Sequence, residues 1–415
     1  MKLGRVLGLL LLGLSLLWTA CGGGPGMCSE GAGTGTGQNG GSGSGASSGG
    51  PGDNVCGTST GGGGNNGGGG GGGASSASAL VYYTSESSNT IQAAGLTGSV
   101  LASLSTTTPT PPVNAQMTFV NQKYLYAALG NAVEGFSLDR TTGVLTNVLG
   151  NLASYPAHGD LVTADPLGRF LFVSGTTTTI NAFQINATTG TLTAAPGSPV
   201  TTRLLQIQEL TVDASGSFLY ASDGNTLIAI YSINPSTGAL TEVTGSPVFL
   251  GVACIQADPA AEFLLATATC LGLGDPHMHV FSINTSTGLL TEISASPFAT
   301  TASVFNFAVS PSGQFVYTFG YAAGSSSTVD PMEGFQMDPT TGALTAISGS
   351  PFASLPTVVN CFFDQSGALM LCSDTLRGSN LYVFAVDPKT GKPGLQATLP
   401  INTTNPIDFM YAITD

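Results

Sequence analysis

The sequence repeats one pattern along most of its length, and this repeat limits the fold more than any other feature. The clearest copy, residues 230–247, reads IYSINPSTGALTEVTGSP: an alternating apolar run, a polar turn ending in Gly, and a second short run. The shared glycine recurs as Gly98, Gly143, Gly190, Gly238, Gly288, Gly342 and Gly391. Successive copies therefore lie 45 to 54 residues apart. A period of about 40–50 residues is typical of one blade of a β-propeller.

Each repeat carries four strand signals, which we label a to d. In one copy they are residues 208–213, 217–222, 226–234 and 238–243. The alternation within Phe218-Leu219-Tyr220 has the period of two that is typical of half-buried strands. The a–b turn reads Asp213-Ala214-Ser215-Gly216, where Asp can accept a backbone hydrogen bond and Gly accepts a positive φ. We therefore interpret these Asp residues as turn residues and not as metal ligands.

The two ends of the repeat region complement one another. The region begins at residues 79–83, which match strand b, and ends at residues 408–415, which match strand a. Pairing these segments makes one complete blade and removes exposed strand edges. The predicted fold is therefore all-β: a seven-bladed β-propeller of four-stranded antiparallel blades over residues 79–415. We expect the C-terminal strand to close the ring by pairing with the N-terminal strands.

The N-terminus carries the pattern of an export signal. Residues 1–20 combine Lys2 and Arg5 with an apolar run that is short for a membrane span. The run ends in LWTAC and resembles a bacterial lipobox, in which Cys21 becomes the lipidated first residue; an ordinary secretory signal is the alternative. Residues 21–78 are rich in Gly and Ser, which predicts a flexible tether. We expect an exported lipoprotein at the outer membrane or cell surface, with the periplasm as the alternative location.

Charge and composition limit the partners. The formal net charge is -14, from 9 basic and 23 acidic residues, and such a surface repels the phosphates of nucleic acids and anionic lipids. We expect no nucleic-acid partner, a membrane contact only through the lipid anchor, and a monomer. The glycine runs lack the Lys and the strand–helix context of a nucleotide-binding loop, and we expect no cofactor.

The repeat strings and the D-x-x-G-x-F-L-Y turns resemble the lactonase-type, 6-phosphogluconolactonase-like seven-bladed propellers of bacteria over residues 79–415. This resemblance implies the opening of a lactone by His and Arg side chains on one face of the ring. The a–b and c–d turns are short and uniform, whereas the b–c loops vary in length. Variable loops on a rigid scaffold usually carry function, so we place the site on the b–c face, around the central channel.

Few residues on that face can support hydrolysis. His158, in the connection before blade 3, is the candidate base for activating water, and Arg203, before blade 4, is the candidate cation for the developing oxyanion. Glu209 lies four residues before its a–b turn and joins them as a catalytic candidate. The alternative is that these polar residues line a solvated channel. The candidate ligand-binding residues are Asp160, Asn306 and Asn360.

Asn306 and Asn360 occupy the same position in their repeats as Glu209. We therefore expect these three side chains to approach one another at the mouth of the channel.

Two histidines form a weak metal-site candidate. His277 and His279 lie in the long b–c loop of blade 5, and on an extended segment they point to the same side; Asp275 could be a third ligand. The alternative is a pair of surface loop residues without a metal.

Four cysteines form two candidate disulfides. Cys361 and Cys372 lie at equal distances from the a–b turn of blade 7, which makes them cross-strand neighbours. Cys254 and Cys270 lie at one end of the inner strands of blade 5. An exported protein meets an oxidising compartment, so either pair could be a disulfide, with buried free thiols as the alternative.

Three functions remain open from the sequence. A surface-anchored propeller that binds a ligand or protein partner fits the lipobox, the tether and the sparse His and Arg residues. An exported lactonase fits the family resemblance together with His158 and Arg203. A purely structural envelope protein would lack a concave polar pocket. We favour the binding propeller.

Overall fold

A computed structural model describes residues 78–85, 88–104, 116–128, 132–150, 161–175, 178–259, 262–268, 276–322, 331–358, 360–374, 380–400 and 407–414. All of them belong to the unit formed by residues 72–415. The signal peptide predicted over residues 1–20, Cys21 and almost all of the tether predicted over residues 21–78 lie outside the described residues. Among the described residues, no helix has the length and apolar character needed to cross a membrane.

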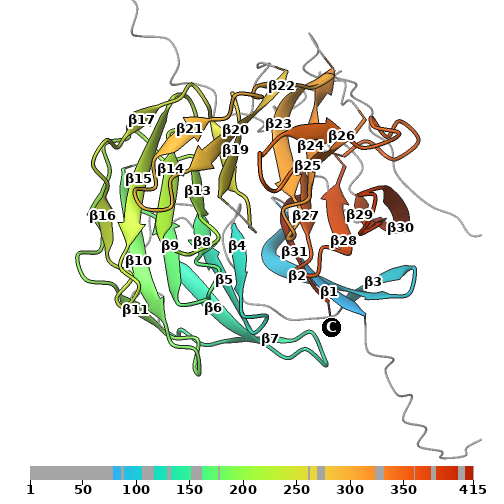
Figure 1. Cartoon of the computed structure of the whole chain (residues 1–415). Coiled ribbons are helices and arrows are strands. Elements are labelled where there is room, and N and C mark those ends of the chain that lie inside the picture. Colours follow the sequence, from blue (N-terminus) through green and yellow to red (C-terminus); the bar gives the residue numbers. More distant parts are fainter. Residues whose placement is uncertain are drawn as a thin grey trace, which may run out of the picture. The chain divides into compact units, whose positions relative to one another are not determined.

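The described strands form seven antiparallel sheets, and we number these sheets as blades in chain order (Figure 1). Blade 1 contains β1 (Ala79–Ser85), β2 (Ser88–Thr97), β3 (Val100–Leu104) and β31 (Ile407–Thr414). Blade 2 contains β4 (Met117–Val120), β5 (Tyr124–Ala128), β6 (Val133–Leu138) and β7 (Leu145–Asn147). Blade 3 contains β8 (Val162–Ala164), β9 (Phe170–Ser174), β10 (Thr179–Ile185), β11 (Leu192–Ala194) and β12 (Val200–Thr201).

The remaining four blades follow the same order of strands. Blade 4 contains β13 (Glu209–Val212), β14 (Phe218–Ser222), β15 (Leu227–Ile233), β16 (Leu240–Glu242) and β17 (Val248–Phe249). Blade 5 contains β18 (Cys254–Ala257), β19 (Phe263–Thr267), β20 (His277–Ile283), β21 (Leu290–Glu292) and β22 (Phe298–Ala299). Blade 6 contains β23 (Ala302–Val309), β24 (Phe315–Ala322), β25 (Glu333–Met337) and β26 (Leu344–Ala346). Blade 7 contains β27 (Asn360–Phe363), β28 (Leu369–Ser373), β29 (Asn380–Val386) and β30 (Pro393–Pro400).

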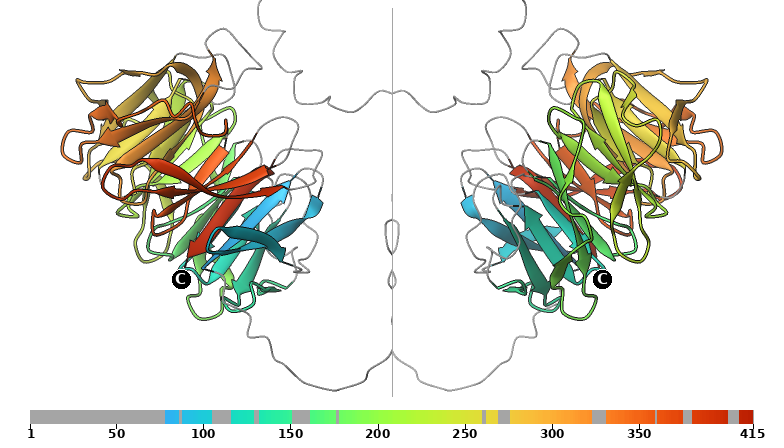
Figure 2. Two further views of the ribbon diagram at one scale, coloured as in Figure 1. Left: turned by 90° about the vertical axis from the view of Figure 1, so that its right-hand side faces the viewer. Right: turned by 90° about the vertical axis from the view of Figure 1, so that its left-hand side faces the viewer.

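Blade 1 joins the two ends of the described chain. The last strand, β31, pairs antiparallel with β1 from Ala79↔Thr414 to Ser85↔Ile407, which is the pairing that the sequence predicts. Figures 1 and 2 show this red strand beside the blue strands of the N-terminal side. The inner strand β31 also contacts β27 of blade 7 and β4 of blade 2. Blade 1 is therefore held by the blades on both of its sides.

Apolar side chains fill the interfaces between neighbouring blades. Each hydrophobic cluster of the described residues combines two adjacent blades; one, for example, joins Tyr82 of blade 1 to Leu125 and Phe136 of blade 2. The period-two pattern of each strand places one set of side chains on each face of its blade, so both faces are covered by a neighbour. This explains the buried runs of the b strands, such as Phe218–Ser222.

Three blades differ from the four-stranded prediction. In blades 3, 4 and 5 a short fifth strand (β12, β17 or β22) pairs with the c strand. In blade 3 the d strand pairs only with Phe183–Ile185 of β10. The backbone N–H and C=O groups of Thr179 and Ile180 are therefore available to pair with β12. A two-residue strand has too little periodicity to be predicted from sequence.

Candidate functional site

The inner strands of blades 3 to 7, together with Gln116 just before β4 of blade 2, line a central cavity of about 390 Å³. It extends from Glu209 and Asn306, which occupy the same repeat position in β13 and β23, to Pro259 and Pro311 in the a–b turns at the other end. The other polar residues of the lining are Gln116, Thr163, Thr211, Gln256 and the two cysteines Cys254 and Cys361. A channel with polar groups along apolar strand walls can hold a small molecule.

Two of the predicted ligand-binding residues meet at this channel. The Asn306 side chain donates a hydrogen bond from Nδ2 to Oδ1 of Asn360, 2.8 Å away. Asn306 Oδ1 accepts a hydrogen bond from the backbone N–H of Phe307, which fixes the orientation of its carboxamide. Asn306 and Glu209 line the same cavity, as their shared position in the repeat predicts.

Burial within the channel raises the pKa of the Glu209 carboxyl to about 8. Glu209 as a residue keeps partial exposure, but its carboxyl is desolvated by the surrounding strands, which disfavours the charged form. At neutral pH most Glu209 side chains therefore carry a proton. In this protonated state the Glu209 carboxyl both donates and accepts hydrogen bonds. It is suited to act as a general acid and not as a general base.

The remaining catalytic and binding candidates do not gather at Glu209 in the described part of the chain. His158 and Asp160 lie outside the described residues. Arg203 Nε lies 3.3 Å from Glu242 Oε2, and its Nη1 donates to the backbone oxygen of Ser246. Two-thirds of the Arg203 side chain is exposed. Its guanidinium is thus held against the c–d side of blade 4, and Arg203 does not line the cavity with Glu209.

The two histidines of blade 5 lie in strand β20, and not in the preceding loop as predicted. The strand extends this far because His277 and Met278 pair with Ala299 and Phe298 of β22. His279 Nδ1 lies 2.8 Å from Glu292 Oε1 on the neighbouring strand. Asp275 lies outside the described residues, and within the described ranges no three His, Cys, Asp or Glu side chains are grouped to hold a metal.

The cysteines lie beside the channel. Cys361 and Cys372 are directly opposite one another in β27 and β28 and form a disulfide, as their register predicts. Cys254 is also disulfide-bonded. Its predicted partner, Cys270, lies outside the described residues.

Sequence reasoning missed two polar features of the ring. Gln116 occupies the same register position as Glu209, but the a–b turn of blade 2 is one residue shorter than its counterparts, which hides the match. Glu134 in β6 is almost fully buried, and burial raises the pKa of its carboxyl. Glu333 occupies the same position in blade 6 and is equally buried, so the Glu-Gly-Phe string shared by residues 134–136 and 333–335 was the sequence signal for this feature.

Solved structures with the same arrangement of blades include candidate 6-phosphogluconolactonases from Bacteroides uniformis and Bacteroides fragilis. The first has 16% identity and a TM-score of 0.60, covering 80% of this chain and 98% of that one. The second has 17% identity and a TM-score of 0.58, covering 82% and 99%. A periplasmic gluconolactonase from Pseudomonas aeruginosa has 17% identity and a TM-score of 0.59, covering 79% and 98%. The chain has the lactonase-type propeller fold.

At these identities the likeness of this lactonase-type propeller to its neighbours concerns the fold. No family model and no curated protein matches the sequence. Activity must therefore be argued from the residues of the channel itself.

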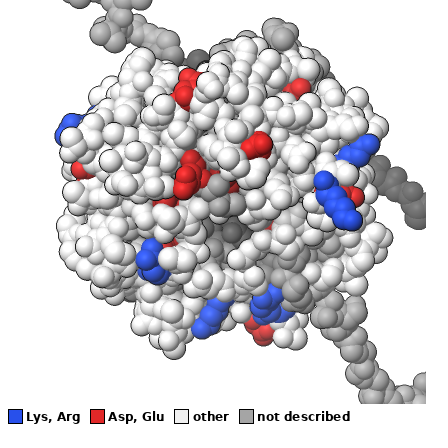
Figure 3. Space-filling view, viewed as in Figure 1, with Lys and Arg blue, Asp and Glu red and all other residues white. Residues whose placement is uncertain are grey.

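The distribution of charged side chains on the surface affects which ligands can approach the ring axis. On the face shown in Figure 3, Lys and Arg side chains lie toward the rim, whereas several Asp and Glu side chains lie nearer the middle. An anion approaching the ring axis from this side meets acidic groups first, which disfavours a phosphorylated ligand.

Proposed function

We propose that this lactonase-type propeller is an exported, envelope-anchored protein that binds a small neutral ligand bearing hydroxyl groups in its central channel. The anchoring rests on the lipobox-like sequence at Cys21 and on the Gly-rich tether. The ligand class rests on the channel.

The observation that carries the proposal is the neutral polar lining of the channel. Glu209 is mostly protonated near pH 7, and the Asn306–Asn360 pair adds carboxamide donors and acceptors. Hydroxyl groups both donate and accept hydrogen bonds, so they match this lining better than a phosphate or an ammonium group does. Among the described lining residues no Lys, Arg or His is present to neutralise an anion.

A binding experiment tests this proposal. The full chain is titrated with neutral sugars and neutral sugar lactones by calorimetry, beside the Asn306→Ala and Glu209→Gln variants. The Asn225→Ala variant is the matched control, because Asn225 is exposed in the b–c loop of blade 4 and does not line the cavity. We expect one saturable site, weakened about tenfold or more by Asn306→Ala and unchanged by Asn225→Ala. Equal binding by Asn306→Ala and the native chain, or no saturable binding, would overturn the proposal.

Lactone hydrolysis is the second candidate function, supported by the fold shared with the three neighbours above. The channel supports it less, because Arg203 is engaged by Glu242 away from the cavity. The same lactones are followed for hydrolysis with the native chain, His158→Ala and Arg203→Ala. If the protein only binds its ligand, none of the three proteins exceeds the spontaneous rate. Turnover by the native chain that His158→Ala abolishes would establish the enzyme instead.

A further inference from the structure

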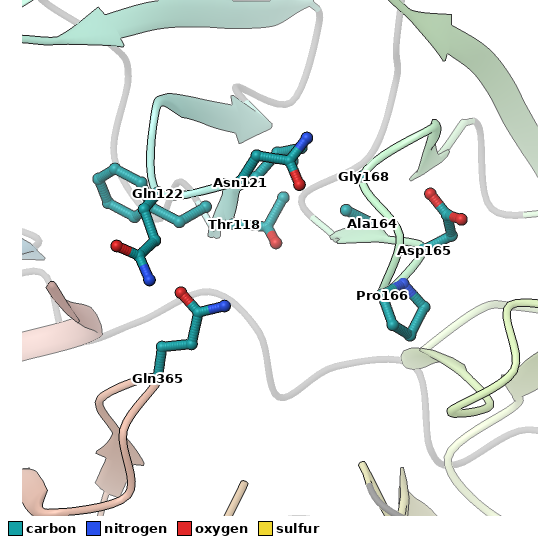
Figure 4. A pocket seen from close by; sticks show the side chains of 10 residues that line it. Thr118, Asn121, Gln122, Ala164, Asp165, Pro166, Gly168 and Gln365 are labelled. Atoms are coloured by element: carbon teal, nitrogen blue, oxygen red, sulfur yellow. The ribbon is translucent and has the colours of Figure 1, made fainter. Parts of the chain in front are cut away.

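A second, smaller pocket lies among the a–b turns. It has a volume of about 130 Å³ and is lined by blade 2, the a–b turn of blade 3, and Gln365 from the a–b turn of blade 7 (Figure 4). Its side chains contribute three carboxamides, from Asn121, Gln122 and Gln365, and the hydroxyl of Thr118. None of these residues lines the central cavity.

The way in which blade 1 is assembled from two distant segments explains why this pocket exists. In blades 2 to 7 an a–b turn joins the inner strand to its neighbour, whereas β31 and β1 come from opposite ends of the repeat region and no turn joins them. Blades 2 and 7 flank blade 1, and their turns supply Gln122 and Gln365. The pocket is thus a consequence of building one blade from both ends of the chain.

The turn of blade 2 holds its amides in fixed positions. Gln122 Oε1 accepts a hydrogen bond of 2.6 Å from Arg140 Nη1, which leaves the Nε2 group to face the pocket. In Figure 4 the carboxamides of Gln122 and Gln365 point toward one another. Asn121 packs closely against Gly168 of blade 3. A Cβ added to Gly168 would lie only 2.4 Å from Asn121 Nδ2.

The same turn has an unfavourable backbone. Asn121 and Gln122 have φ angles of 52° and 53°, the only positive φ values of non-Gly residues in the described ranges. The other turns of this kind place Gly168, Gly216, Gly313 or Gly367 in that conformation. A Gln in the left-handed region costs about 1 kcal/mol, and such strain often marks a functional position. Gly would relieve the strain but would remove the carboxamide.

The electrostatics of the pocket are close to neutral. Asp165 is its only charged lining residue, and its carboxylate is already engaged by Arg169 Nε at 2.7 Å and by two backbone N–H groups. The remaining amides and hydroxyl each donate and accept hydrogen bonds, as alcohol groups do. The volume corresponds to about four water molecules.

We propose that this turn-face pocket is a second binding site, distinct from the channel, for a small neutral polyol such as glycerol or one edge of a sugar ring. Gln122 and Gln365 hold its hydroxyl groups from opposite sides. Asn121 and Gly168 position the turn of blade 2.

The test uses the full chain with glycerol and glucose as probes, observed by saturation-transfer NMR and titration. The variants are Gln365→Ala and Gln122→Gly, with Gln314→Ala as the matched control, because Gln314 is an exposed Gln near the a–b turn of blade 6. We expect each pocket variant to raise the dissociation constant about tenfold and the control to leave it unchanged. We also expect Gln122→Gly to melt at the same temperature as the native chain or higher, since it relieves strain.

Binding that survives both pocket variants would overturn the proposal. If that binding is lost in Asn306→Ala, the probes occupy the channel instead. No saturable binding of either probe would also overturn the proposal.

Discussion

The Tyr220 hydroxyl donates a hydrogen bond to the backbone oxygen of Gly288, 2.9 Å away and in the next blade of the ring. Tyr220 is fully buried in a b strand, and Gly288 ends the c–d turn of blade 5. The same tyrosine-to-glycine hydrogen bond recurs between three other pairs of adjacent blades: Tyr82–Gly143, Tyr126–Gly190 and Tyr317–Gly391. The repeat thus carries a polar link between blades within an otherwise apolar interface.

We predict that Tyr220→Phe lowers the free energy of unfolding by about 1–2 kcal/mol, because the buried Gly288 carbonyl loses its partner. Tyr231→Phe in the same blade is the control. Tyr231 is equally buried, but no hydrogen-bond partner for its hydroxyl is found among the described residues. We therefore expect Tyr231→Phe to be neutral or stabilising in urea denaturation. Equal destabilisation by both variants would show that ring packing, and not the bond, matters.

A second prediction concerns the glycine of the c–d turn. Gly288 has a φ of 73°, and a Cβ at this position would lie 2.5 Å from Phe218 Cδ1 of the preceding blade. Gly251 has a similar φ of 66°, with no atom within 4 Å of such a Cβ. Gly288→Ala should therefore be less stable than Gly251→Ala by about 1–3 kcal/mol, since only the first adds a clash to the shared backbone strain. Thermal denaturation of the two variants measures this difference, and equal melting temperatures would refute it.

The fold was predictable because its signals are local and repeated. All seven glycines that define the repeat have a positive φ, and the Asp213 carboxylate accepts backbone N–H bonds within its own turn. Each of these features depends on a few consecutive residues. Seven copies made the pattern visible.

The candidate site residues were harder to predict because their placement depends on packing between distant segments. Gln122 and Gln365 are distant in sequence and line one pocket between blades 2 and 7, where blade 1 supplies no a–b turn. The sequence placed Arg203 in the connection before blade 4, but it did not show that Glu242 holds the guanidinium away from the channel. Asn306 and Asn360 were correctly paired because the repeat itself gives them equivalent positions.

The Cys361–Cys372 disulfide should stabilise blade 7 measurably. It joins residues 11 apart in sequence, and closing a loop of this size contributes about 2–3 kcal/mol. We expect the double variant Cys361→Ala/Cys372→Ala to lose this amount under oxidising conditions. The difference from the native chain should shrink in a reductant, which acts on the Cys254 disulfide in both proteins. A difference that the reductant leaves unchanged would mean that packing of the two sulfur atoms is the cause.

The last prediction uses the protonation of Glu209 in the channel. Its carboxyl has a pKa of about 8 in the folded protein and an ordinary value of 4.5, so the folded state holds the proton more tightly than the unfolded state. Between these two values the folded state binds more protons, and stability falls as pH rises. Glu209→Gln removes this dependence, because Gln stays neutral.

The variant and the native chain should therefore be similarly stable near pH 4.5. Glu209→Gln should be the more stable of the two at pH 8, by at least about 1 kcal/mol after allowance for water in the channel. Urea denaturation at pH 4.5, 6 and 8 measures the difference, in which the contributions of the other carboxyl groups cancel. A difference that stays constant across this range would show that the Glu209 carboxyl ionises freely in the channel, and the lining would then carry a negative charge at neutral pH.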